Sequence, residues 1–103
     1  DLKGHLVDDK FTIIDFGAPW CGPCHTAAET LSAYLRDHKD VAVRVVNLRA
    51  DDVTLSYALP AAQQHLLYAP GLPWFLVYSP SGRVIHKSTS VEKVLAAIEK
   101  KRK

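Results

Sequence analysis

The two cysteines of the chain stand in the segment Trp20-Cys21-Gly22-Pro23-Cys24. The segment follows a run of strand-forming residues and precedes a helical pattern, so Cys21 is expected at a helix N-terminus. Unpaired backbone N–H groups and the helix dipole lower the pKa of a thiol there and favour the reactive thiolate. Because a helical turn brings both sulfurs within disulfide reach, the pair predicts thiol–disulfide chemistry. Cys21 would be the exposed attacking thiolate, and Cys24, one turn inside the helix, the buried resolving thiol.

Asp15 is the one charged residue of the apolar run 11–16, six residues before Cys21. An ionised carboxylate is costly to bury, so burial in this run should raise its pKa. A carboxyl group of raised pKa suits a base that deprotonates Cys24. The alternative is that Asp15 is a hydrogen-bonded polar group of the core with no chemical role.

The elements that position these residues follow from the hydrophobic pattern. The run 11–16 predicts a strand buried on both faces, and a short strand over residues 4–7 and a turn over 8–10 are expected before it. Apolar positions at helical spacing predict a helix over about residues 22–38. Pro23 falls in its first turn, where a missing N–H is harmless.

The second half of the chain continues the alternation of strands and helices. It predicts a strand over 41–48, followed by helical residues 52–67 that Pro60 splits in two. A strand over 74–79, a turn at 80–83 and a hairpin partner at 84–86 come next. The last helix is expected to have Ser90 as its N-cap. This order predicts an α/β sandwich whose sheet is parallel in its first half and antiparallel in its second. The chain has 103 residues, which fits a single domain spanning residues 1–103.

The sequence resembles the thioredoxin-like family over nearly its whole length. Residues 20–24 match the active-site motif of thioredoxins, and Asp15 stands where the family has its buried aspartate. The segment Gly71-Leu72-Pro73 resembles the family's cis-proline loop, which faces the cysteines. The resemblance implies a thioredoxin-like α/β/α sandwich with a mixed central sheet.

The resemblance also implies roles for particular residues. Cys21, Cys24 and Asp15 would be catalytic, with Asp15 helping to deprotonate Cys24. The expected contacts with the substrate chain come from Trp20, Gly22, Pro23, Leu72 and Pro73, although Trp20 could equally be a packing residue. Gly22-Pro23 resembles the reducing members of the family, which favours a reductase. Its partners would be a disulfide-containing protein substrate and an upstream electron-donor protein, with no cofactor.

Four departures from the family pattern concern the substrate groove and proton handling. The strand and helix that usually open the family's fold have no room here, because about ten residues precede the first strong strand. A kinking proline of the first helix is replaced by Glu29, and a lysine beside the buried aspartate is replaced by Val45. The residue after the cis-proline, commonly threonine, is Trp74.

Other functions fit the same motif less well. Cys21 to His25 matches the CxxCH pattern of haem attachment, but the chain lacks methionine and its strand-rich runs do not suit a helical haem pocket. His25 is then expected to be a solvent-facing helix residue that could tune Cys24. A zinc site would need two further ligands, and the histidines show no suitable spacing, so no metal is expected. A non-catalytic interaction module with vestigial cysteines is a further alternative.

Charge and hydropathy exclude other classes. The net charge is +2, but residues 100–103 supply four of the 13 basic residues, leaving nine against 11 acidic residues in the remaining chain. That body is not a basic nucleic-acid surface, and the basic tail is expected to be a solvated, frayed helix end. No apolar run reaches the length of a membrane span.

We expect a monomer. The opening Asp1-Leu2-Lys3-Gly4 and the missing Met favour the bacterial periplasm or cell envelope, with the cytoplasm as the alternative.

Overall fold

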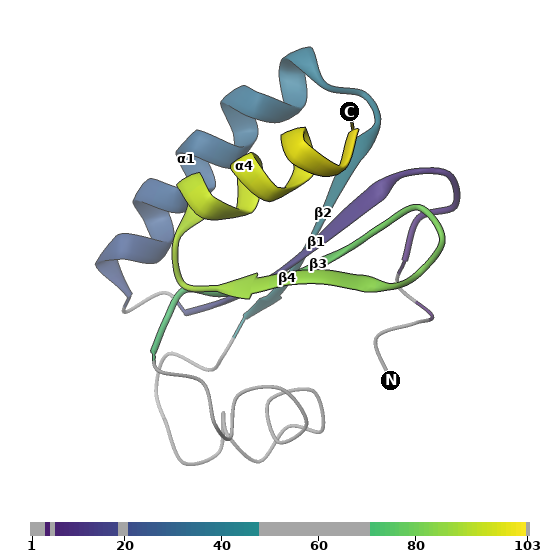
Figure 1. Cartoon of the computed structure of the whole chain (residues 1–103). Helices are drawn as coiled ribbons and strands as arrows, with labels where there is room; N and C mark the ends of the chain where they lie inside the picture. Colours follow the sequence, from purple (N-terminus) through teal and green to yellow (C-terminus); the bar gives the residue numbers. More distant parts are fainter. Residues whose placement is uncertain (1–3, 5, 19–20, 48–70, 103) are drawn as a thin grey trace.

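The computed structural model describes residues 4, 6–18, 21–47 and 71–102. Four strands and two helices occur in these ranges (Figure 1). In chain order they are β1 (Phe11–Gly17), α1 (Gly22–Asp37), β2 (Val41–Asn47), β3 (Trp74–Tyr78), β4 (Val84–Ser88) and α4 (Val91–Arg102). The expected helical segment 52–67 lies outside the described residues.

The strands form one mixed sheet in the order β2-β1-β3-β4. β1 runs parallel to β2, with Asp15 opposite Val45, and antiparallel to β3, with Asp15 opposite Phe75. β3 and β4 form an antiparallel pair. The expected change from parallel to antiparallel pairing is confirmed, and Asp15 lies on a central strand.

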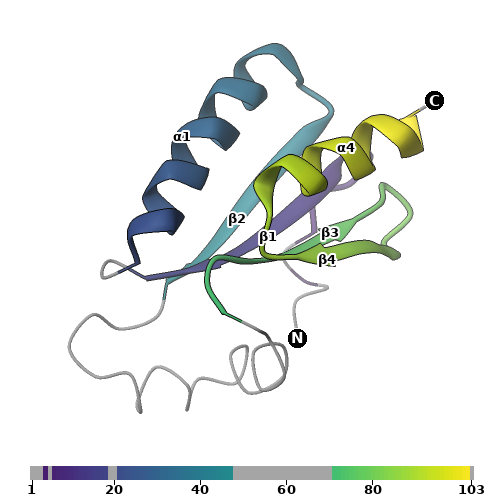
Figure 2. The ribbon, with the colours of Figure 1, turned by 60° about the vertical axis from the view of Figure 1, so that its left-hand side comes forward.

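Both helices cover the same face of the sheet, where α1 and α4 lie side by side (Figures 1 and 2). Because side chains alternate across a strand, β1 contributes Phe11 and Ile13 to the core beneath the helices and Ile14 and Phe16 to the opposite face. The α/β class and the mixed sheet are confirmed. The other helical layer of the expected sandwich would fall within residues 48–70, outside the described ranges.

Side chains at both helix N-termini bond to backbone amides that have no helical partner. Cys21 is the N-cap of α1, with extended backbone angles, and Pro23 stands in the first turn. Ser90 precedes α4, and its Oγ accepts the Lys93 N–H at 3.3 Å and donates to Glu92 Oε2 at 3.2 Å. The prediction of Ser90 as N-cap is therefore confirmed.

The expected short strand over residues 4–7 is wrong for the residues described there. Leu6 and Val7 lie outside the sheet, because local partners bond the backbone of Val7. Its carbonyl accepts the Lys10 N–H at 3.2 Å, and its N–H donates to Thr12 Oγ1 at 3.1 Å. The turn over residues 8–10 is present, and Asp9 adopts a positive φ of 64° within it.

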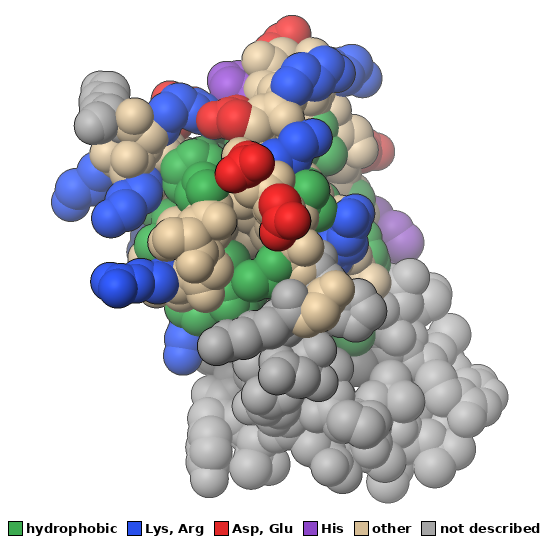
Figure 3. Space-filling view, turned by 90° about the vertical axis from the view of Figure 1, so that its right-hand side faces the viewer, with side chains coloured by type: hydrophobic (Ala, Val, Ile, Leu, Met, Phe, Trp, Pro, Cys, Tyr) green, Lys and Arg blue, Asp and Glu red, His purple; other side chains and the backbone are tan. Residues whose placement is uncertain are grey.

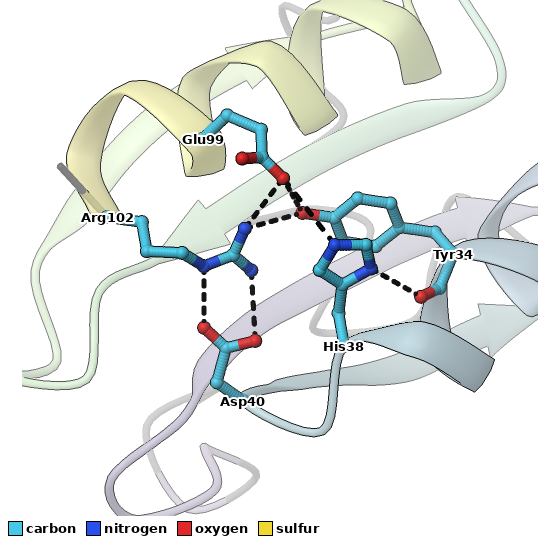
Figure 4. A network of polar contacts seen from close by, with 5 residues as sticks. All are labelled: Tyr34, His38, Asp40, Glu99 and Arg102. Carbon is cyan, nitrogen blue, oxygen red and sulfur yellow. Dashed lines mark hydrogen bonds and ion pairs between the residues drawn. The ribbon is translucent and has the colours of Figure 1, made fainter.

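The basic C-terminus is not a frayed end at Arg102, which corrects another expectation. Arg102 closes α4 and donates from Nε and Nη2 to the two carboxylate oxygens of Asp40 at 2.8 and 2.9 Å (Figure 4). Its Nη1 donates to Glu99 Oε1 at 2.6 Å and to the Tyr34 hydroxyl at 3.1 Å. These bonds fasten α4 to the end of α1, and basic and acidic side chains are interspersed on this end of the molecule (Figure 3).

Candidate active site

Cys21 and Cys24 form a disulfide at the start of α1, with their Cα atoms 5.3 Å apart. The Cys21 N–H donates to the carbonyl of Ala18 at 3.0 Å, in the turn that joins β1 to the helix. The Cys21 sulfur accepts the backbone N–H of Cys24 at 3.3 Å. The prediction that Cys21 stands at the helix N-terminus is confirmed, and an N–H donor aimed at this sulfur would stabilise a thiolate there.

The expected difference in exposure between the cysteines is wrong for this disulfide-bonded state. Cys21 is 7% exposed and Cys24 is 8% exposed. Because the disulfide holds the two sulfurs together, one hydrophobic cluster with Ala18 and Phe16 encloses both. The two cysteines differ instead in their neighbours, since Cys21 caps the helix and Cys24 borders a cavity that also contains Asp15.

Asp15 is buried beside Cys24, as its place in the apolar run predicts. It is 5% exposed, and its Oδ1 has no hydrogen-bond partner among the described residues. Burial raises the pKa of Asp15 from its usual 3.8 to about 6, because the apolar surroundings penalise the charged form. The alternative of a hydrogen-bonded core group does not fit this bare oxygen.

Gly17 lies beside both Asp15 and Cys24. A Cβ atom built on this glycine would lie 3.5 Å from the Cys24 sulfur and 3.8 Å from Asp15 Oδ1. A side chain longer than a methyl group would therefore come between the sulfur and the carboxyl group. Sequence reasoning missed this residue, and its signal is a glycine at the end of β1, two positions after the buried acid.

Two adjoining cavities of about 230 Å³ each flank Asp15 between α1 and β2. Asp15, Ala28 and Val45 line both of them. The first reaches Cys24 and His25, and the second continues along the helix beside Leu31, Ser32, Leu35 and Val43. Val45 pairs with Asp15 in the sheet and is 57% exposed. An apolar side chain therefore lies beside the acid, as expected from the comparison with the family pattern, which has a lysine there.

The Leu72–Pro73 segment also lies at this site. The peptide bond between these residues is cis, as expected from the sequence. Leu72 and Trp74 pack against the cluster that contains both cysteines, while Pro73 and Pro23 line a hollow of about 410 Å³ that extends to Ser90. The structure thus brings Pro23, Leu72 and Pro73 together around the disulfide. Trp20, the remaining aromatic candidate, lies outside the described residues.

The ranges described contain no group of three His, Cys, Asp or Glu side chains placed to hold a metal ion. No helix within them is both long and apolar enough to cross a membrane.

The thioredoxin family profile matches residues 2–100. The chain belongs to the thioredoxin family. It is 41% identical over 54 residues to Thioredoxin-T of Drosophila melanogaster, covering 50% of this chain and 34% of that protein. It is 32% identical over 71 residues to a thioredoxin of Alicyclobacillus acidocaldarius, covering 66% and 67%. The alignments to Thioredoxin-T and to a thioredoxin of Griffithsia pacifica span about a third of the length of each of those proteins.

Solved thioredoxin structures share the fold. The reduced thioredoxin pre-protein of Schistosoma mansoni superposes with a TM-score of 0.64 at 26% identity, covering 96% of this chain and 84% of that one. Thioredoxin f2 of Chlamydomonas reinhardtii gives a TM-score of 0.66 at 23% identity, covering 90% and 80%. These likenesses show that the chain has the thioredoxin fold.

His25 follows Cys24 on α1 and is exposed, which confirms the expected solvent-facing helix position. It also lines the cavity that Asp15 and Cys24 share. The sequence indicated that His25 could tune Cys24, but it did not indicate that His25 would lie in one cavity with Asp15.

Proposed function

We propose that this chain is a thiol–disulfide oxidoreductase that reduces protein disulfides. The Cys21 thiolate attacks a substrate sulfur and forms a mixed disulfide, and one substrate thiolate leaves. Cys24 then transfers its proton to Asp15 and attacks the Cys21 sulfur, which releases the second substrate thiolate. The product is the Cys21–Cys24 disulfide, and an upstream donor protein must supply two electrons to reduce it again.

The observation that carries this proposal is the disulfide at the N-cap of α1 beside the buried carboxyl group of Asp15, whose Oδ1 has no partner among the described residues. The capping position favours a thiolate on Cys21, and the raised pKa of Asp15 suits a base that works near neutral pH. Neither feature is needed for a structural disulfide. Together they support redox chemistry over a non-catalytic module with vestigial cysteines.

The surface around Leu72 supports a disulfide-containing protein as the substrate. Leu72 is half-buried and precedes β3, at the end of the sheet where the cysteines lie. We propose that its backbone pairs with an extended substrate segment in the manner of strand addition. Gly22 and Pro23 are exposed at the start of α1 and complete this contact surface.

Reduction of insulin by the dithiothreitol-reduced protein tests the proposed activity. We expect Cys21→Ser to abolish turnover, and Cys24→Ser to accumulate mixed disulfides that mass spectrometry detects. Arg36→Gln, on the exposed surface of the last turn of α1, is the control and should retain turnover. A wild-type protein that does not reduce insulin would favour the non-catalytic module. Alkylation of reduced protein that labels Cys24 before Cys21 would reverse the assigned roles.

A further inference from the structure

One cavity brings together three groups that can exchange protons. Asp15 enters it from β1, and Cys24 and His25 enter it from the first turn of α1. The remaining lining residues are Gly17, Ala18, Ala28 and Val45, none of which can accept or donate a side-chain proton. The adjoining cavity adds one hydroxyl group, that of Ser32.

The proposed reaction requires a proton to leave this buried place. When Asp15 accepts the proton of Cys24, the proton must pass on to solvent within the same turnover, because otherwise it returns to Cys24 and the mixed disulfide persists. Asp15 is 5% exposed, and its Oδ1 has no partner among the described residues that could receive the proton. His25, by contrast, is exposed at the helix surface and lines the same cavity.

We propose that His25 is the group through which this proton passes between Asp15 and bulk water, an inference that rests on the proposed function. As the Cys24 S–H bond breaks, a sulfur–sulfur bond to Cys21 forms and the substrate thiolate leaves. The proton goes to Asp15, then to the neutral imidazole of His25, and from the imidazolium to solvent. A cavity of about 230 Å³ has room for water that bridges the two groups.

The groups that line this cavity with His25 are consistent with this path. β1 contributes the carboxyl group of Asp15, and α1 contributes Cys24. β2 contributes the apolar Val45 and therefore no charge. Among the described lining residues, His25 is the side chain whose ring nitrogens can accept and donate a proton and that is also open to solvent.

His25→Gln tests the inference in single-turnover reactions of the reduced protein with insulin. Acid quenching and mass spectrometry measure how fast the mixed disulfide decays. We expect decay to slow by about a hundredfold, the lower end of the range for a positioned acid–base group, while the attack by Cys21 keeps its rate. His86→Gln, on β4 and bonded to Ser88 instead, is the matched control and should decay as wild type does.

Added imidazole separates proton transfer from a structural role. We expect it to restore the decay rate in His25→Ala in proportion to its concentration, and to leave the wild-type rate unchanged. Decay in His25→Gln at the wild-type rate at every pH would overturn the inference while leaving the oxidoreductase proposal intact. A slowed His25→Ala that imidazole does not rescue would likewise overturn it. A wild-type protein without activity would remove the proposed function and this inference together.

Discussion

The two ends of α1 treat polar groups in opposite ways. At its N-terminal end, Asp15 is buried with an unpaired oxygen between two cavities. At its C-terminal end, the side chain of Tyr34 and those of the residues around it bond to one another (Figure 4). In the described part of the chain, the buried polar side-chain atoms without a partner are Asp15 Oδ1 and Trp74 Nε1, and both residues lie at the disulfide end. The paired groups hold the helix in place from its far end.

The pKa values of the carboxyl groups at the two ends are shifted in opposite directions. Burial raises the pKa of Asp15 to about 6. At the far end, the hydrogen bond from Arg102 lowers the pKa of Asp40, and hydrogen bonds from Tyr34 and Arg102 lower that of Glu99. A raised pKa in the folded state makes stability fall as pH rises, and a lowered pKa makes it fall as pH drops.

Replacement of the buried acid should have the largest effect on stability. The folded-state pKa of Asp15, about 6, exceeds its usual 3.8, so its destabilising effect is absent below about pH 4 and complete above about pH 6. We expect Asp15→Asn to raise the free energy of unfolding by up to about 3 kcal/mol at pH 7, and to slow disulfide exchange. Urea denaturation at pH 4 and pH 7 measures the change. An equal effect at both pH values would show that Asp15 does not titrate in this way.

A cation placed beside the acid should make the two ends more alike. Val45 pairs with Asp15 across the strands and is exposed, so a lysine there can reach the carboxyl group from solvent. We expect Val45→Lys to lower the pKa of Asp15 by about one unit, because an opposite charge favours the ionised form. The Asp15 side-chain carbon signal in NMR, followed against pH, reports this pKa. Val45→Met is the uncharged control, and an equal shift in both variants would contradict the electrostatic explanation.

Loss of a partner at the far end should have a smaller effect with the opposite pH dependence. The bidentate Asp40–Arg102 pair is part-buried, and we expect Asp40→Asn to cost about 1 kcal/mol at neutral pH, the upper end for such pairs. In a domain of this size, that lowers Tm by about 4–8 °C. Because the pKa of Asp40 is lowered in the folded state, its ionised carboxylate stabilises the fold at pH values above the usual pKa of an aspartate. This stabilisation is lost as pH falls through the folded-state pKa. The difference from wild type should therefore shrink as pH falls below the usual pKa of an aspartate. Insulin reduction should not change.

Much of this protein could be predicted because it depends on local sequence. Residues 11–16 and the helical spacing after Cys21 are patterns within single elements, and the structure confirms β1 and α1 there. The Cys21–Cys24 disulfide joins residues three positions apart at the start of one helix, so the sequence spacing was enough to predict that the two sulfurs can meet. The raised pKa of Asp15 followed from its apolar neighbours in the same strand.

Only the tertiary structure determined the features that depend on contacts between different helices, strands and turns. The expectation of a strand over residues 4–7 rested on those residues alone, which could not reveal that Val7 bonds instead to Thr12 and Lys10. The sequence of the basic residues 100–103 could not show that Arg102 bonds to Asp40, which lies 62 residues away in the chain. The cavity shared by Asp15 and His25 depends on how α1 packs over β1 and β2. Spacing along one element determines periodicity and local charge, whereas packing between elements determines which side chains meet and which polar atoms find no partner.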